Sequence, residues 1–231
     1  MRLPWEELEP ASRSTTERQR RAVLRLERLT DHVFSAAVMV LVILPAMPHL
    51  LNAADSSLTW QSLLQMYSTL LLHVLSVFIL FVLWMLHHYE FHYLTRASGA
   101  LAWLNALLLL CVALTPITTS MLNGFASEGV AVLLYEADML AMLLLLVLIW
   151  RHAAGAGLLF GSDIPSRTVG RMRLILRAGA VILLLIAVLA LFVPNVSLAL
   201  TAALFMLYAV ITARGGYALD LRRGGLASQD N

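Results

Sequence analysis

The chain of 231 residues is 60% hydrophobic and only 13% charged, whereas soluble domains average about 45–50% apolar and about 25% charged residues. A water-soluble fold cannot bury so much apolar surface, so we predict an all-α integral membrane protein with spans of about 20 residues each. The net charge is only +2. Because the sequence has no nucleophile with its base, no phosphate-binding loop and no nucleic-acid-binding motif, we expect neither an enzyme nor a partner of DNA or RNA.

The polar N-terminal part, residues 1–24, is predicted to form a cytosolic tail and the start of the first helix. Ser14 and Glu17 have the spacing of a capping box, so this helix should begin near Thr15. It should enter the membrane as a first span from about Asp31 to Leu44, before Pro45 and Pro48.

Five further apolar stretches cover about residues 63–86, 101–122, 130–150, 174–193 and 196–213. The second span should continue as a helix through His92, and the last two should form a tight hairpin through Pro194 and Asn195. The sequence thus predicts a six-helix membrane domain over residues 25–214 and a cytosolic tail over residues 215–231.

All sixteen lysine or arginine positions are arginines, and all of them lie on one side of this predicted topology. Seven precede the first span, and the others fall between spans two and three, between spans four and five, or after span six. Positive charge in short loops is retained in the cytosol. We therefore predict a multi-pass protein of the cell membrane with both termini cytosolic, and we expect membrane lipids to contact its basic edge.

The polar residues that open the first span follow a recognisable order. Arg25 is followed, after three residues, by Leu29, Thr30 and Asp31. This resembles the transmembrane protein 175 family of potassium channels, whose signature is an arginine, three variable residues and then Phe-Ser-Asp; Leu29 and Thr30 are conservative replacements. The likeness continues through the next two spans at Trp84, His87, His88, Phe91, Asn105, Pro116 and Thr119.

The resemblance implies a six-helix subunit of a homotetramer, with the first helix of each copy lining a central pore. It also implies passive conduction of potassium or other monovalent cations without a carbonyl filter loop. In the family the polar residues of the motif contact neighbouring helices, so we expect Arg25, Leu29, Thr30 and Asp31 to meet His87 and Asn105. Within the first helix, Arg28 and Asp31 also have a spacing that allows an ion pair.

Ala36, Val40 and Ile43 lie on one face of the first helix, with Met39 beside them. This face either lines the pore or packs against neighbouring helices. The family usually has isoleucine at the position of Ala36 and threonine at that of Met39. Four alanines make a wider ring, which would move the constriction to Met39 or Val40. These departures favour an alternative function, a non-conducting scaffold or accessory relative of the channels.

Other ionisable residues allow weaker hypotheses. His88 and His92 have metal-ligand spacing, but two ligands are too few to fix a metal ion. His73 and His87 share a helix face at a distance that suits two haems, which gives a haem-bearing redox protein as a third possibility. We predict no metal and no cofactor. Glu136 and Asp138 either belong to a cation or proton path or are simply wetted near the outer interface.

Overall fold

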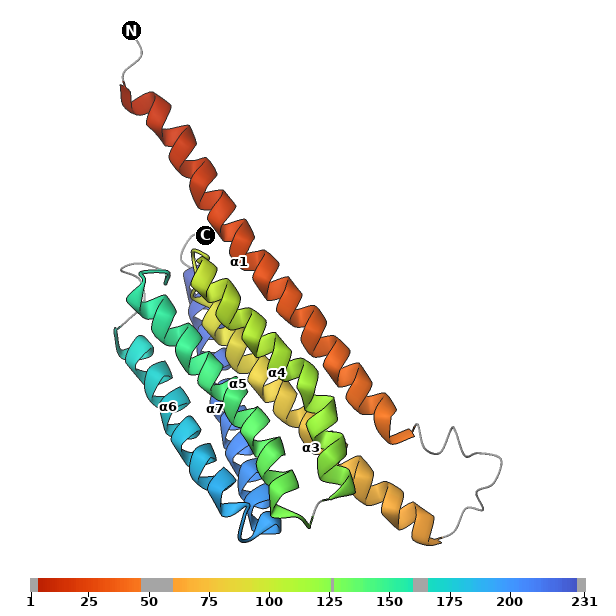
Figure 1. Ribbon diagram of the computed structural model, residues 1–231. Helices are drawn as coiled ribbons and strands as arrows, with labels where there is room; N and C mark the ends of the chain where they lie inside the picture. Colours follow the sequence, from red (N-terminus) through yellow and green to blue (C-terminus); the bar gives the residue numbers. More distant parts are fainter. Residues whose placement is uncertain (1–3, 47–59, 126, 160–165, 228–231) are drawn as a thin grey trace.

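The computed structural model describes residues 4–46, 60–125, 127–159 and 166–227, and the regular elements of this part of the chain are helices joined by short turns and loops (Figure 1). Its elements, in order, are α1 (Pro4–Ile43), the short 3₁₀-helix η1 (Leu44–Ala46), α3 (Trp60–His92), α4 (Gly99–Gly124), α5 (Gly129–Gly155), α6 (Ser166–Leu189) and α7 (Pro194–Ala227). The six predicted helices are therefore confirmed.

Five of these helices are long and apolar enough to cross a membrane: Thr69–His92, Gly99–Gly124, Gly129–Gly155, Val169–Leu189 and Pro194–Arg214. The described part of α1 does not meet the same standard. Its apolar stretch from His32 to Ile43 spans only about 18 Å by helix rise, against about 30 Å of hydrocarbon. Glu27, Arg28 and Asp31 interrupt the preceding turns.

Two details of the helix boundaries follow from local sequence. The helix α1 begins at Pro4, so the prediction of a start near Thr15 was wrong; proline fits the first turn, and the acidic side chains of Glu6 and Glu7 favour a helix N-terminus. The predicted hairpin of the last two spans forms, but its turn lies at residues 190–193 and not at Pro194 and Asn195, because α6 ends at Leu189 and α7 begins at Pro194, where proline again occupies the first helical position.

The centre of the bundle is α5, which contacts α3, α4, α6 and α7. The helix α1 lies at the periphery and packs mainly on α3 and α4 (Figure 1). It buries one stripe of residues spaced three, four or seven apart, as a helix packed along one side should. That stripe consists of Val23, Thr30, Phe34, Ala37 and Leu41.

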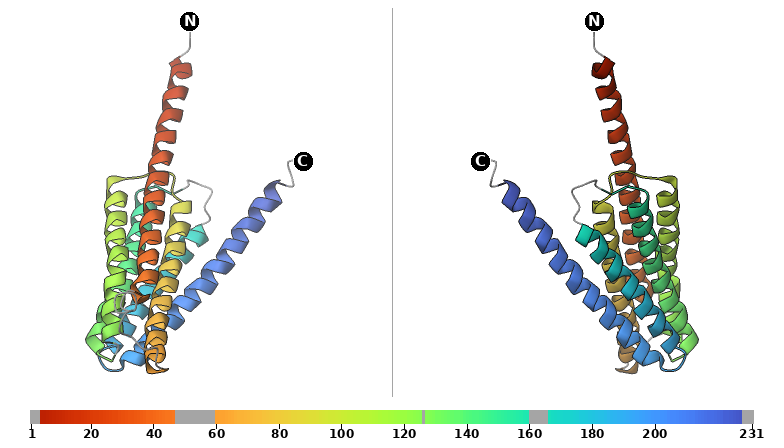
Figure 2. Two further views of the ribbon diagram at one scale, coloured as in Figure 1. Left: turned by 90° about the vertical axis from the view of Figure 1, so that its right-hand side faces the viewer. Right: turned by 90° about the vertical axis from the view of Figure 1, so that its left-hand side faces the viewer.

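The first turns of α1 and the last turns of α7 extend beyond the bundle at the same end (Figure 2). The arginines follow this geometry: outside residues 1–3, they lie in the first part of α1, in the loop before α4, at the end of α5, in the first half of α6 or in the last part of α7. The bundle therefore has one basic end.

Candidate functional site

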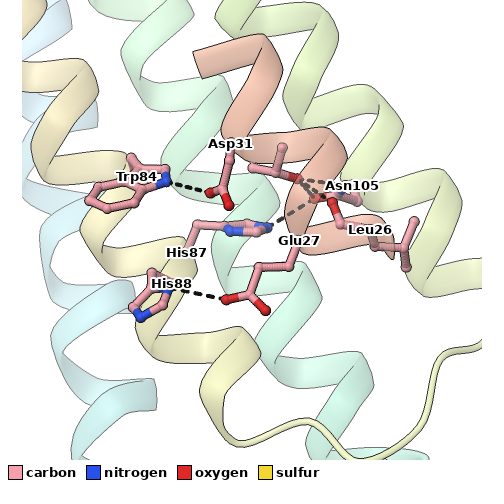
Figure 3. Close-up of polar contacts among 8 residues, drawn as sticks. Leu26, Glu27, Asp31, Trp84, His87, His88 and Asn105 are labelled. Carbon is pink, nitrogen blue, oxygen red and sulfur yellow. Dashed lines mark hydrogen bonds and ion pairs between the residues drawn. The ribbon is translucent and has the colours of Figure 1, made fainter. Parts of the chain in front are cut away.

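The α1 polar network joins the middle of α1 to α3 and α4 through side chains of Glu27, Thr30, Asp31, Trp84, His87, His88 and Asn105 (Figure 3). At its centre, Thr30, His87 and Asn105 are almost completely buried. The side-chain amide of Asn105 lies between the other two. Its Oδ1 is 3.0 Å from His87 Nε2, and its Nδ2 donates to Thr30 Oγ1 at 3.0 Å.

One direction of hydrogen bonding satisfies Thr30, Asn105 and His87 together. Thr30 Oγ1 accepts from Asn105 and lies 3.0 Å from the backbone oxygen of Leu26. If the hydroxyl donates to that oxygen, Asn105 Oδ1 is free to accept from His87, which must then carry its proton on Nε2. One amide thus satisfies a donor on α3 and an acceptor on α1.

Two further contacts flank this core on the α3 side. Trp84 Nε1 donates to Asp31 Oδ1 at 2.8 Å, and His88 Nδ1 lies 3.1 Å from Glu27 Oε1. The rings of Trp84 and His88 stack with their centroids 5.8 Å apart. Glu27, Thr30 and Asp31 therefore each have a partner on α3 or α4, and these partners fix the rotation of α1.

The structure brings together only part of the predicted motif. Asn105 joins Thr30 and His87, whereas Asp31 contacts Trp84, and the described residues contain no ion pair between Arg28 and Asp31. The side chains of Arg25 and Leu29 are exposed. They line a groove between α1 and the start of α4 instead of the network.

The four residues predicted to line a pore lie on the face of α1 opposite its buried stripe. Ala36, Met39, Val40 and Ile43 are all exposed in the single chain, and Met39 retains 65% of its accessible surface. They form an apolar strip that the described residues leave partly or largely exposed. The α1 polar network sets the direction in which this strip points, because both lie on the same rigid helix.

A second buried polar group was not anticipated. The α5 carboxylate cluster consists of Glu136 and Asp138 with hydroxyl partners on α4 and α7. Glu136 accepts from Ser197 at 2.7 Å and from Thr201 at 2.9 Å. Asp138 Oδ2 accepts from Thr115 at 3.0 Å and from Thr118 at 3.2 Å. The interpretation of simply wetted carboxylates was wrong, because both are buried.

A sequence feature could have located one side of this cluster. Ser197 and Thr201 are four residues apart on α7, hence on one face of the mainly apolar first half of this helix, and such a pair of hydroxyls predicts a buried acceptor on a neighbour. Beside the cluster, the hydroxyl oxygens of Ser76 and Tyr135 are 3.1 Å apart, and Thr119 donates to Ser76 at 2.9 Å. The centre of the bundle is therefore also joined by polar contacts.

Fold and polar contacts define a helical membrane protein whose first helix is fixed by a polar motif and presents an uncovered apolar face. A family model described as the endosomal/lysosomal potassium channel TMEM175 matches residues 25–116, the segment from the start of the motif to Pro116. A potassium channel of Streptomyces collinus is 31% identical over 155 residues, or 64% of this chain and 74% of that protein. The chain therefore belongs to the TMEM175 family, as predicted, and this is a family of ion channels rather than enzymes.

Two other comparisons agree. A potassium channel of Chamaesiphon minutus is 30% identical over 135 residues, which cover 57% of this chain and 66% of that protein. The crystal structure of a lysosomal potassium-selective channel TMEM175 homologue from the same organism superimposes with a TM-score of 0.66 at 24% identity. It covers 83% of this chain and 98% of that one, so the shared fold extends well beyond the motif.

Proposed function

We propose that this chain is a subunit of a homotetrameric channel that conducts potassium or other monovalent cations passively. Its membership of the TMEM175 family supports this proposal, as do relatives that are named potassium channels. The observation that carries it is the uncovered strip of Ala36, Met39, Val40 and Ile43 on α1. An apolar helix face left open in one chain is available for an axis shared by several copies.

In the proposed assembly α1 also crosses the membrane, which brings the number of spans from five to six. Its short apolar stretch is extended toward the basic end by the turns that contain Glu27, Thr30 and Asp31. Polar groups at the edge of the hydrocarbon are stabilised by partners, and here each of the three has one on a neighbouring helix. The apolar stretch of an isolated α1 would be too short to cross the hydrocarbon, whereas the packed helix can cross it because its polar side chains have partners.

The proposed orientation places the basic end of the bundle in the cytosol of the cell, by the positive-inside rule. Both termini are then cytosolic, residues 25–214 form the membrane domain, and residues 1–24 and 215–231 extend from it. The last turns of α1 face the opposite side. Cations would therefore pass along α1 from the polar network to Ile43.

Selectivity in such a pore comes from width and hydration. Rings of Ala36, Val40 and Ile43 offer no hydroxyl or carbonyl oxygen, so an ion passes them with part of its water shell, and the narrowest ring sets the barrier. Met39, with a long and flexible side chain, is proposed to form that ring.

Flux of potassium and of sodium into proteoliposomes tests the proposal. Val40→Trp and Ala36→Trp place a large ring on the open strip and should abolish flux without disturbing the buried stripe. Leu185→Trp adds the same side chain to an exposed position of α6 and is the matched control. A strictly monomeric protein in detergent would contradict the tetramer.

The alternative function, a non-conducting scaffold or accessory relative, is favoured by the departures at Ala36 and Met39 from the family pattern. It predicts a folded tetramer with no flux above that of empty liposomes. In that case Ala36→Ile with Met39→Thr, which brings both positions to the usual residues, should produce potassium flux. Flux in the unaltered protein contradicts this alternative.

A further inference from the structure

A groove of about 650 Å³ lies between α1 and the start of α4. From α1 it is lined by Arg18, Arg21, Ala22, Arg25, Leu26 and Leu29, and from the other side by Ala97, Ser98, Gly99 and Ala102. The two walls are held together by Gln19, whose side-chain oxygen accepts from the backbone N–H of Ala97 at 3.3 Å. The groove is not part of the α1 polar network.

One wall carries three guanidinium groups. Arg18, Arg21 and Arg25 are spaced three and four residues apart, so they lie along one face of α1. Arg21 lies 3.6 Å from Glu17 in an exposed pair. Arg18 and Arg25 have no ion-pair partner within the described part of the chain, and no acidic residue lines the groove.

The opposite wall is the N-terminus of α4. Ser98 caps this helix by accepting from the backbone N–H of Leu101 at 3.1 Å, while the N–H groups of Gly99 and Ala100, which open the first turn, have no carbonyl four residues back inside the helix. A helix N-terminus favours negative charge. Gly99 leaves this wall open, because a Cβ at that position would meet no atom within 4 Å.

The polarity of the groove changes along its length. The arginines lie toward the N-terminal, basic end, and Leu26 and Leu29 continue the same wall toward the membrane-spanning part of α1. A free anion would need only the charged half. An amphiphile with an anionic head and an apolar tail matches both halves in the same order.

We infer that this groove binds an anionic phospholipid, with the headgroup phosphate between Arg18, Arg21 and the N-terminus of α4 and an acyl chain along Leu26 and Leu29. The inference rests on the membrane placement of α1 and makes no use of conduction. Clusters of basic residues beside a membrane span attract anionic lipids. Here the second wall adds a defined position for one headgroup.

Native mass spectrometry of the full chain in detergent, titrated with phosphatidylglycerol or phosphatidylcholine, tests the inference. Phosphatidylglycerol should bind on the order of tenfold more tightly, and Arg18→Gln with Arg21→Gln should remove most of that preference. Arg20→Gln with Arg28→Gln removes the same charge from exposed positions of α1 outside the groove. This control pair should keep the preference.

A third variant distinguishes loss of lipid binding in the groove from loss of protein stability. Gly99→Asp places a carboxylate in the open part of the groove, at a helix position where negative charge is favourable, so it should displace the lipid from a protein that unfolds no more easily. The inference is overturned if both arginine pairs reduce the preference for phosphatidylglycerol equally. It is also overturned if the unaltered chain shows no preference between the two headgroups. Full competition by inorganic phosphate, which identifies a free-anion site, overturns it as well, as does binding of a poly-glutamate peptide in place of the lipid, which identifies an acidic protein partner.

Discussion

The α1 polar network and the α5 carboxylate cluster are both buried, yet they hold the molecule together in different ways. The network fixes a peripheral helix on one side only and uses an indole, an imidazole and an amide as donors. The cluster lies at the central helix and receives hydroxyl donors from α4 on one side and α7 on the other.

This difference distinguishes polar contacts that only stabilise the fold from polar contacts that also orient an exposed helix face. Around α5, the neighbouring helices α4 and α7 bury Glu136 and Asp138 with their hydroxyl partners, so polar contacts there serve the stability of the single chain. Around α1, contacts on one side leave Met39 and its neighbours uncovered. We expect substitutions near α5 to act mainly on unfolding and substitutions in the α1 polar network to act also on flux.

The largest effect on stability is expected at the close contact of α6 with α7. A Cβ on Gly179 would collide with the hydroxyl of Tyr208, which donates to the backbone oxygen of Ile175 at 2.9 Å. Gly179→Ala should therefore cost about 2–3 kcal/mol in the free energy of unfolding, measured by thermal unfolding in detergent. Gly170→Ala on the same helix meets open space and should be neutral or stabilise by up to about 1 kcal/mol. Equal behaviour of the two variants would contradict the close contact.

The next effect is expected in the α1 polar network. Asn105→Leu leaves the His87 N–H and the Thr30 hydroxyl without their shared partner, which should cost about 1–2 kcal/mol in the free energy of unfolding. Because α1 then loses its fixed rotation, potassium flux should fall by more than the loss of folded protein explains. Asn123→Leu, on the same helix but with no side-chain hydrogen bond within the described residues, is the control. Unchanged potassium flux in the folded Asn105→Leu protein would mean that the α1 polar network does not influence conduction.

The sequence was sufficient for the helices because apolar runs of this length have one outcome in a membrane. The same holds for the single basic end, which follows from helix order and arginine positions. The first turns of α1 were missed because propensity near Pro4 and Glu6 outweighed an internal capping box. Such boundaries depend on small differences between local signals.

Partners across helices were harder to predict. Asp31 has Arg28 nearby in sequence, but its carboxylate meets Trp84 because the rotation of α1 on α3 directs it there. That rotation follows from the whole buried stripe, not from a local spacing. Asn105 and His87 were expected as partners only through the family resemblance. The contact of Ser197 with Glu136 was missed because the spacing of residues along one helix does not indicate which residue of a neighbouring helix a hydroxyl meets.

A smaller effect is expected in the α5 carboxylate cluster. Thr201→Val keeps the shape of the side chain but removes the hydroxyl that donates to Glu136 at 2.9 Å, so the free energy of unfolding should fall by about 1 kcal/mol. Thr212→Val is the matched control on α7, because that hydroxyl bonds only to backbone oxygens of its own helix. Flux per amount of folded protein should be the same in both variants. A selective loss of flux in Thr201→Val would make the cluster part of an ion path.

The smallest effect is expected for the pair of Glu27 and His88, whose side chains are 21% and 48% exposed. In a double-mutant cycle with Glu27→Gln and His88→Gln, the coupling should be below about 0.5 kcal/mol, because water screens exposed charges. A coupling clearly above about 1 kcal/mol would mean that the pair lies in a medium of low dielectric constant. The hydrocarbon boundary would then lie at least one turn closer to the N-terminus of α1, and the polar network would be deep in the membrane rather than at its edge.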